Sequence, residues 1–144
     1  KEPPYPNSYD FLRHLEPRVP DSLQYLITDW FKEISLYDLR VGEAIGKEME
    51  DGNYEVNIVI EAARIRADTI GNETGLTPND WIDVGLFADD DASELIAIRR
   101  IKIDQENMEV KLRTDEKPAK AAIDPKRLLI ERIIDDNMKS VEYN

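Results

Sequence analysis

The sequence contains no cysteine and only one histidine, and both shortages exclude kinds of site. Without cysteine there is no disulfide, no thiolate metal site and no cysteine nucleophile. The histidine, His14, lies outside any His-Glu-x-x-His frame, whereas a catalytic zinc ion normally has several nitrogen or carboxylate ligands. No nucleophile-elbow motif accompanies it for a Ser-His-Asp triad. We therefore expect His14 to lie at the surface or in a contact with another domain.

Glycine, long apolar runs and positive charge are also scarce. The 6 glycines are scattered through turn-like stretches, so there is no glycine-rich phosphate loop. No apolar run approaches the ~20 residues that span a bilayer, so we expect no direct membrane insertion. With 19 Lys and Arg against 31 Asp and Glu the net charge is −12. This balance argues against nucleic acid and anionic membrane as partners, since both bind basic patches.

The abundant acids form no recognisable site. The Asp-Asp-Asp run at 89–91 and the Asp-Asp-Asn run at 135–137 lack the alternating spacing of a calcium loop. A catalytic carboxylate pair cannot be selected from so many acids. We predict no catalytic residue, no cofactor-binding residue and no metal ligand in this chain. The basic cluster of Arg99, Arg100 and Lys102 is expected to be ion-paired at a strand edge or face.

The first part of the chain is predicted to be a linker followed by one amphipathic helix. Residues 1–20 hold most of the prolines, which leaves room for only a short helical turn near Tyr9 to Leu15. Residues 21–34 have helical periodicity, with Asp21 as N-cap and Gln24 in capping-box position. The polar face of this helix includes Asp29. Its opposite face is an apolar stripe, which supplies our candidate interface residues: Leu23, Leu26, Ile27, Trp30 and Phe31.

Two interpretations of the apolar stripe remain open. The stripe packs on the sheet of its own domain, or it belongs to a contact with a neighbouring domain. In the second case Trp30 and Phe31 form an exposed apolar patch.

From residue 36 the hydrophobic period changes to two, which predicts strands. A strand to about residue 49 is joined by the Asp51-Gly52 turn to a long strand over 54–66, as an antiparallel hairpin. In that long strand Tyr54, Val56 and Ile58 begin the inward-facing row, which continues at positions 60 and 62. Residues 67–80 are expected to carry the chain to a second sheet. Further strands are predicted at 81–88, 94–103, 108–113, 118–123 and 128–133.

These elements predict a mostly β protein, an immunoglobulin-like antiparallel β-sandwich of about seven strands preceded by one amphipathic helix. The absence of a Cys–Trp–Cys pattern excludes an antibody-type domain. We divide the chain into a linker and helix at 1–35, the sandwich at 36–134, and a polar tail at 135–144 that we expect to fray. The chain opens Lys-Glu-Pro-Pro without an initiating Met, so we expect a piece of a longer protein.

Three stretches together resemble a known family. They are His-Leu-Glu-Pro at 14–17 with the stretch that follows to residue 38, Asn-Asp-Trp-Ile-Asp-Val-Gly at 79–85, and residues 115–125 with the closing Asp-Asp-Asn at 135–137. Their order resembles the C-terminal end of bacterial zinc aminopeptidases of the gluzincin type, the aminopeptidase N superfamily. The closest resemblance is to proteins that fuse such a peptidase to an ABC-transporter-permease-like membrane region. Glu131, where aspartate is expected, and the apolar Ile133-Ile134 pair depart from the family pattern.

The resemblance implies the last helix of a helical peptidase region followed by a β-sandwich. In that family the zinc ligands and general base lie in an upstream His-Glu-x-x-His helix, so zinc is expected only in the parent protein. The leading hypothesis is a non-catalytic accessory domain that braces the catalytic region or shapes access to it. Its partner would be the upstream peptidase domain of the same polypeptide, in a bacterial, membrane-associated parent.

Two other functions are weighed against this one. A stand-alone carbohydrate- or protein-binding module would present an aromatic platform on one outer face, built from Trp81, Phe87 or Tyr54. A hydrolase in its own right is disfavoured, because the sequence has no recognisable nucleophile or metal-ligand set.

Overall fold

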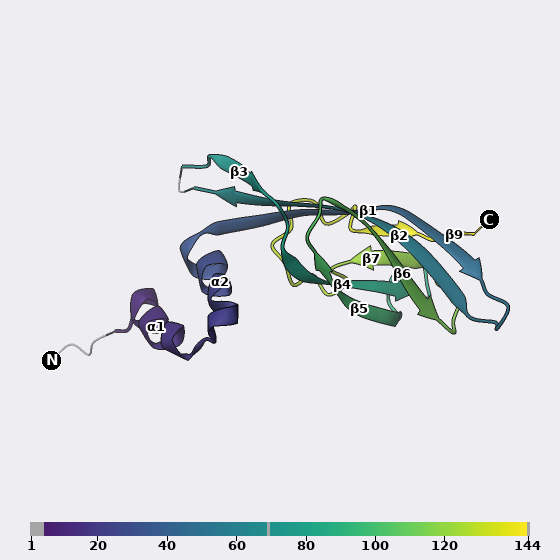
Figure 1. The fold of residues 1–144 in the computed structure, drawn as a ribbon, viewed down its shortest axis with the longest axis horizontal. Coiled ribbons are helices and arrows are strands. Elements are labelled where there is room, and N and C mark those ends of the chain that lie inside the picture. The colour runs from purple at the N-terminus through teal and green to yellow at the C-terminus, as the bar shows by residue number, and fades with distance from the viewer. Residues whose placement is uncertain (1–4, 69, 144) are drawn as a thin grey trace.

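Two β-sheets pack face to face, and a short helical region lies at one end of them (Figure 1). The structure is a computed structural model that describes residues 5–68 and 70–143. Within those residues nine strands form a five-stranded and a four-stranded sheet. The predicted class, a mostly β sandwich preceded by helix, is confirmed, although the strands outnumber the seven expected.

The helical region consists of several short pieces. Helix α1 spans Ser8–Leu15 and is followed by the 3₁₀ turns η1, Glu16–Arg18, and η2, Asp21–Leu23. Helix α2 spans Gln24–Ile27, and the π-helical turn η3 spans Thr28–Lys32. Asn7 caps α1, since its side chain accepts a hydrogen bond from Asp10 N–H at 3.0 Å and its own N–H donates to the Asp10 carboxylate at 3.1 Å.

The prediction of one regular helix over 21–34 is wrong. Asp21 does not cap, and the Gln24 side chain donates to the carbonyls of Glu16 and Val19 at 2.9 and 2.7 Å, away from the predicted capping box. The helical hydrogen bonding therefore changes type twice before Lys32. Residue Ile34 already belongs to the first strand.

The first sheet is built on a long hairpin of β1, Ile34–Glu48, and β2, Tyr54–Ala67. The predicted turn joins them: Met49 N–H donates to the Asn53 carbonyl at 2.8 Å, and Gly52 adopts the positive φ of 83° that favours glycine. Strands β3, Glu73–Leu76, and β6, Asn107–Thr114, pair with different stretches of β2. Strand β9, Glu142–Tyr143, pairs with β1 in parallel.

The second sheet has the order β5-β4-β7-β8. Its strands span Asp80–Phe87 for β4, Leu95–Ile103 for β5, Lys120–Ile123 for β7 and Met138–Ser140 for β8. The core lies between the two sheets and is made by the alternate inward side chains of each strand. Its fully buried members include Leu39, Val56, Ile58, Ile60, Val84, Leu86, Ile103 and Ile123.

The connection over 67–80 was only partly predicted. It leads to the second sheet, as expected, but it first folds back as β3 against the end of β2. Asp68 stabilises this return, because its carboxylate accepts hydrogen bonds from the N–H groups of Ile70 and Asn72. The chain therefore makes a turn at Asp68 and adds β3 to the first sheet before it crosses to the second sheet.

Residues 128–133 do not form the predicted closing strand. The carboxylate of Asp124 accepts hydrogen bonds from the N–H groups of Leu128 and Leu129, at 3.0 and 2.9 Å, and turns the chain away from β7. This segment is joined to β1 by an isolated bridge between Tyr37 and Glu131 and by the Leu39 N–H, which donates to the Glu131 carboxylate at 3.1 Å. Local hydrogen bonding therefore overrides the apolar alternation.

The tail at 135–144, predicted to fray, is paired over the part that the structure describes; Asn144 lies outside the described residues. Strand β8 pairs with β7, and β9 pairs with β1, so the end of the chain contributes to both sheets. The Tyr143 hydroxyl donates to the Pro118 carbonyl at 2.8 Å. A Cβ on Gly46 would stand 2.5 Å from the Tyr143 ring, so glycine at 46 makes room for this tyrosine. The partners lie far away in sequence, which is why local polarity gave no sign of them.

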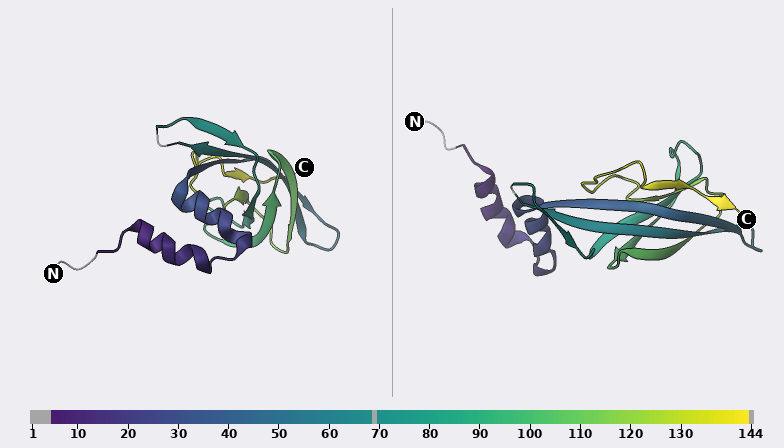
Figure 2. Two further views of the ribbon diagram at one scale, coloured as in Figure 1. Left: turned by 60° about the vertical axis from the view of Figure 1, so that its left-hand side comes forward. Right: turned by 90° about the horizontal axis from the view of Figure 1, so that it is seen from above.

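Figure 2 shows β1 and β2 running from the helical region through the length of the sandwich, with β9 at the far end. Among the described residues no helix combines the length and apolar character that crossing a membrane requires.

Candidate interaction site at the helix–sandwich junction

The apolar stripe is only partly buried. Ile27 is 4% exposed and anchors the helical region, whereas Leu26 is half-buried. Leu23 is exposed, Trp30 is 68% exposed and Phe31 is 44% exposed. The stripe as a whole therefore does not pack on its own sandwich, and the two large aromatic side chains lie at the surface.

Helix α1 extends this apolar surface. The rings of Phe11 and Phe31 lie 5.7 Å apart at a tilt of 52°, and Phe11 is itself exposed. Lys32 Nζ lies 2.5 Å from Glu16 Oε1, which ties η3 back to η1. We call Phe11, Trp30 and Phe31 the aromatic surface of the helical region.

A buried arginine joins the helical region to both sheets. Arg64, on β2, places Nη2 2.5 Å from Asp29 Oδ1 of η3 and Nη1 3.6 Å from Asp80 Oδ1 of β4. The three side chains are 10%, 9% and 9% exposed. The guanidinium carbon lies 5.8 Å from the centre of the Tyr37 ring, within cation–π range. We call Arg64, Asp29 and Asp80 the junction cluster.

The protonation states in the junction cluster follow from its burial and charge. Burial by itself lowers the pKa of Arg64, and the surrounding Tyr37, Asp80 and Asp29 more than offset this, so its pKa is raised. Burial, assisted by the charge of Asp80, raises the pKa of the Tyr37 phenol far above its usual 10.0. Arg64 is therefore a permanent cation and Tyr37 a neutral ring at physiological pH.

A second ion pair lies beside the junction cluster at the surface. Arg66 lies two residues after Arg64, on the same face of β2, and its Nε is 2.6 Å from Glu33 Oε2. These side chains are 44% and 27% exposed, so water screens the pair. Both ion pairs link the stretch 29–33 to the end of β2.

A cleft of about 670 Å³ opens between the helical region and β4. Two aromatic side chains reach it, Tyr25 from α2 and Trp81 from β4, and Trp81 is 60% exposed. Lys102 lies over the Trp81 ring at 5.8 Å and donates to the Asn79 carbonyl at 2.9 Å. Aromatic faces beside fixed polar groups suit ligand or partner binding.

The predicted aromatic platform does not form. Trp81 is exposed, but Phe87 is buried and Tyr54 is half-buried with its ring edge-on to Tyr143, the centres 6.2 Å apart. The prediction placed Trp81 and Phe87 on the same face of one strand, because they are an even number of residues apart. In the structure the pairing register of β4 with β5 shifts between Leu86 and Phe87. A β-bulge of this kind re-aims the residue that follows it.

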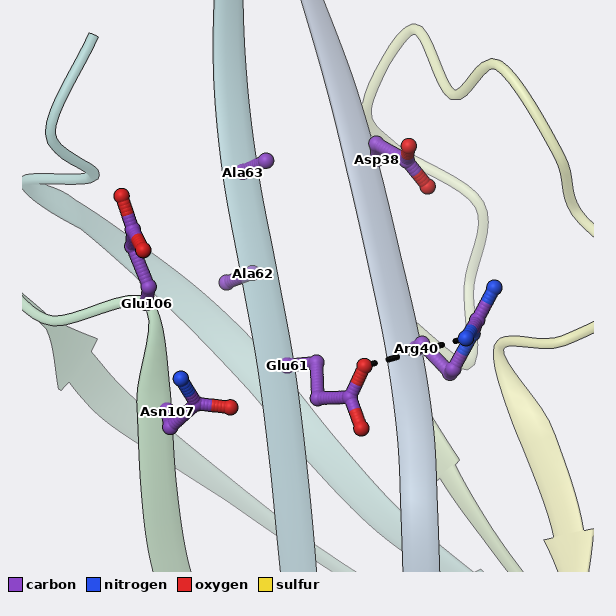
Figure 3. Close-up of a pocket in the computed structure, with 7 residues that line it drawn as sticks. All are labelled: Asp38, Arg40, Glu61, Ala62, Ala63, Glu106 and Asn107. Atoms are coloured by element: carbon purple, nitrogen blue, oxygen red, sulfur yellow. Dashed lines mark ion pairs between the residues drawn. The ribbon is translucent and has the colours of Figure 1, made fainter. Parts of the chain in front are cut away.

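A shallower hollow of about 340 Å³ lies along β1, β2 and the start of β6 (Figure 3). It is lined by the acids Asp38, Glu61 and Glu106, by Arg40, and by Asn107 and two alanines. Arg40 is already engaged, 3.8 Å from Glu61 and 3.0 Å from Asp136. The hollow is thus an acidic surface whose one cation is already paired, without the converging apolar walls of a ligand site.

The remaining candidates from the sequence are dispersed. His14 is exposed on α1. Asp89, first of the acidic run, accepts hydrogen bonds from the N–H groups of Ser93 and Glu94, which lower its pKa and close a loop. Asp136, of the second run, pairs with Arg40. Across residues 5–68 and 70–143, no three His, Asp or Glu side chains gather as metal ligands.

The sequence reasoning missed the junction cluster. It placed Asp29 on the solvent face of the helix, whereas its side chain is buried against Arg64. A signal was present, because Arg64 continues the inward-facing row of Tyr54 to Ala62 at period two. A charge at an inward position implies a buried counter-charge, although nothing local identifies Asp29 and Asp80 as its partners.

Comparison of the chain with protein families, with curated proteins and with solved structures finds no match.

Proposed function

We propose that this chain is a non-catalytic accessory β-sandwich that docks through its helical region onto a partner domain. The partner is the peptidase region of a zinc aminopeptidase of the gluzincin type, upstream in the same polypeptide, in a bacterial protein with an ABC-transporter-permease-like membrane region. The accessory domain braces the catalytic region or shapes access to its cleft. The observation that carries this proposal is the exposed aromatic surface of Phe11, Trp30 and Phe31.

Exposure of these rings favours a partner. Burial of Phe31 and Trp30 against a partner would contribute about 1.5–3 kcal/mol for each side chain. Here Ile27 is buried and its neighbours on the stripe remain at the surface. Large aromatic side chains in this position are typical of the centre of a protein–protein interface.

The fixed attachment of the helical region also supports docking. The junction cluster holds η3 through Asp29, and Gln24 and Lys32 tie the preceding turns together. A surface held in one arrangement loses little conformational entropy on binding. The region is therefore suited to a permanent domain contact.

The family assignment rests on the ordered residues described above, and a gene-level observation tests it. The reading frame upstream of Lys1 is expected to encode a His-Glu-x-x-His motif. A frame without this motif would overturn the assignment.

The docking is tested with the chain and the upstream region as separate polypeptides. Isothermal titration calorimetry is expected to show saturable binding that Trp30→Ala weakens at least tenfold. Trp81→Ala is the matched control, because it removes the other tryptophan from the sandwich. The chain alone is expected to show no aminopeptidase activity with zinc; robust zinc-dependent hydrolysis by the pure chain would refute a non-catalytic role.

The exposed Trp81 beside the cleft favours a second function, a stand-alone carbohydrate- or protein-binding module. The ring is 60% exposed, and Tyr25 faces the same cleft. A glycan-array and pull-down screen would support this function if tight binding depended on Trp81 and not on Trp30.

A further inference from the structure

Two strand edges lie beside each other without pairing. Within the described chain β5 pairs with β4 alone, and β6 pairs with β2 alone. The short turn at 104–106 joins β5 to β6, but no ladder connects them. Each strand therefore keeps a row of backbone groups on its open side, which is a template for a further strand.

A continuous groove follows the seam between these edges. One hollow, of about 470 Å³, is lined by residues that include Ala97, Arg99, Leu112 and Arg113. A second, of about 350 Å³, includes Trp81 and Met108 and shares Arg99 and Lys111 with the first. We call the two together the β5–β6 groove.

The groove is basic in a chain whose net charge is −12. The cations along it are Arg99, Arg100, Lys102, Lys111 and Arg113. Glu55 and Glu109 are the acids that line it. Five of the 19 Lys and Arg side chains lie along this one seam, about a quarter of them. The local charge is therefore opposite in sign to the net charge of the chain.

Several of these cations are already paired. Arg100 Nε is 2.8 Å from Asp83 Oδ1, so the predicted ion pairing of the basic cluster is confirmed at this residue. Arg113 Nε is 2.7 Å from Glu55 Oε2, and Lys111 is 3.8 Å from the same carboxylate. These pairs hold the cations in place on the outer side of the groove.

Arg99 differs from the other cations. It lies opposite Val84 in the ladder, with Ile101 on the same inward-facing side of β5. Ile101 is buried, whereas Arg99 is exposed and has no ion pair among the described residues. An unpaired cation at an open edge repels another basic strand and attracts an acidic one.

We propose that the β5–β6 groove binds an extended acidic peptide segment, which adds as a strand to the open edge of β5. Backbone hydrogen bonds to the edge would supply affinity, and alternate side chains would supply specificity. The carboxylates of the segment would lie at Arg99, and its alternate apolar side chains would lie against Ile98, which is on the other face of β5. This partner is separate from the domain that docks on the aromatic surface.

The test uses a fluorescein-labelled octapeptide that alternates Glu with Val, titrated with the whole chain and followed by anisotropy. We expect saturable binding, weakened in 0.5 M salt because exposed charges are screened. The same peptide with Lys in place of Glu is expected not to bind. Single-stranded DNA of equal charge is also expected not to bind; equal affinity for DNA would overturn the proposal.

Two variants locate the binding on the groove. Arg99→Glu is expected to weaken binding at least tenfold, whereas Arg13→Glu, the same charge change on the exposed surface of α1, is expected to leave it within twofold. Arg99→Ala provides a milder change, and thermal melting shows whether each variant is folded. Equal losses from Arg99→Glu and Arg13→Glu would show non-specific charge attraction and refute the proposal.

A modified peptide distinguishes strand addition from charge alone. N-methylation at alternate residues removes the N–H groups that pair with an edge, so it is expected to abolish binding. Hydrogen exchange of residues 95–103 is expected to slow on binding of the unmodified peptide. Unchanged affinity after N-methylation, or unchanged exchange, would refute strand addition whatever the outcome for the aromatic surface.

Discussion

Replacing Arg64 with methionine tests whether the junction cluster holds the helical region to the sandwich. The change removes the cation and leaves an apolar side chain that replaces the aliphatic stem of the arginine. It leaves the carboxylates of Asp29 and Asp80, each about 9% exposed, without their shared counter-charge.

The magnitude follows from the distances. At an effective dielectric constant of about 20, charges separated by 2.5 and 3.6 Å attract with about 6–7 and 4–5 kcal/mol. Lost hydration of the buried ions costs several kcal/mol each, so the intact cluster contributes little net stability. Removing the cation leaves the hydration cost uncompensated, and we expect a loss of about 3–5 kcal/mol.

The assay is urea unfolding at pH 7, followed by circular dichroism and tryptophan fluorescence. The free energy of unfolding of a chain of this size is about 5–15 kcal/mol, so the variant is expected to remain folded at low temperature. In a thermal melt its melting temperature is expected to be about 10–15 °C lower. The matched control is Arg66→Met, which breaks the screened pair with Glu33 and is expected to cost less than about 1 kcal/mol.

A triple variant completes the test. Combining Arg64→Met with Asp29→Leu and Asp80→Asn removes all the buried charges and keeps an acceptor for the Asn79 N–H. It is expected to recover most of the lost stability. Equal costs for Arg64→Met and Arg66→Met, or a triple variant as unstable as the single one, would refute the reasoning.

Three further predictions concern pH and packing. Burial raises the pKa of Tyr37, so the stability that its protonated form contributes is lost as pH rises above 10; Tyr37→Phe is expected to flatten this alkaline decline in melting temperature. Hydrogen bonds from Arg100 lower the pKa of Asp83 below 3.8, so its contribution is present above about pH 4 and lost as pH falls further. Asp83→Asn is expected to flatten that acid decline, and an unchanged profile would contradict the pairing. Gly46→Ala is expected to cost about 1–3 kcal/mol by pushing β9 aside, whereas Gly75→Ala, with open space around it, is expected to be nearly neutral in urea unfolding.

The long hairpin was predictable because its signals are local. Alternation from Tyr54 to Ala62 fixes which side of β2 faces the core, and the Asp51-Gly52 turn fixes the partner strand. The same alternation extends to Arg64 and makes it inward-facing. The burial of Asp29 was not predictable, since helical periodicity assigns it to the solvent face and only the packing of η3 on β2 reverses this.

The structure of the C-terminal part of the chain was not predictable from local signals. Strand β9 has two residues and pairs in parallel with β1, a contact that no short-range pattern encodes. Residues 128–133 carry a strand-like pattern, yet the hydrogen bonds to Asp124 divert them. In both places distant partners or a single capping side chain outweigh local propensity.

The chain passes from Lys32 through Glu33 directly into β1, without an intervening linker. Glu33 is paired with Arg66, and Asp29 is paired with the buried Arg64, so the stretch before β1 is attached to β2 at two points. The aromatic surface at one end and the β5–β6 groove along the sandwich are therefore kept at a constant separation. Two partners bound at these places would be held at a fixed distance from each other. An insertion after Lys32 alone would not change this distance, because Asp29 would remain bound to Arg64.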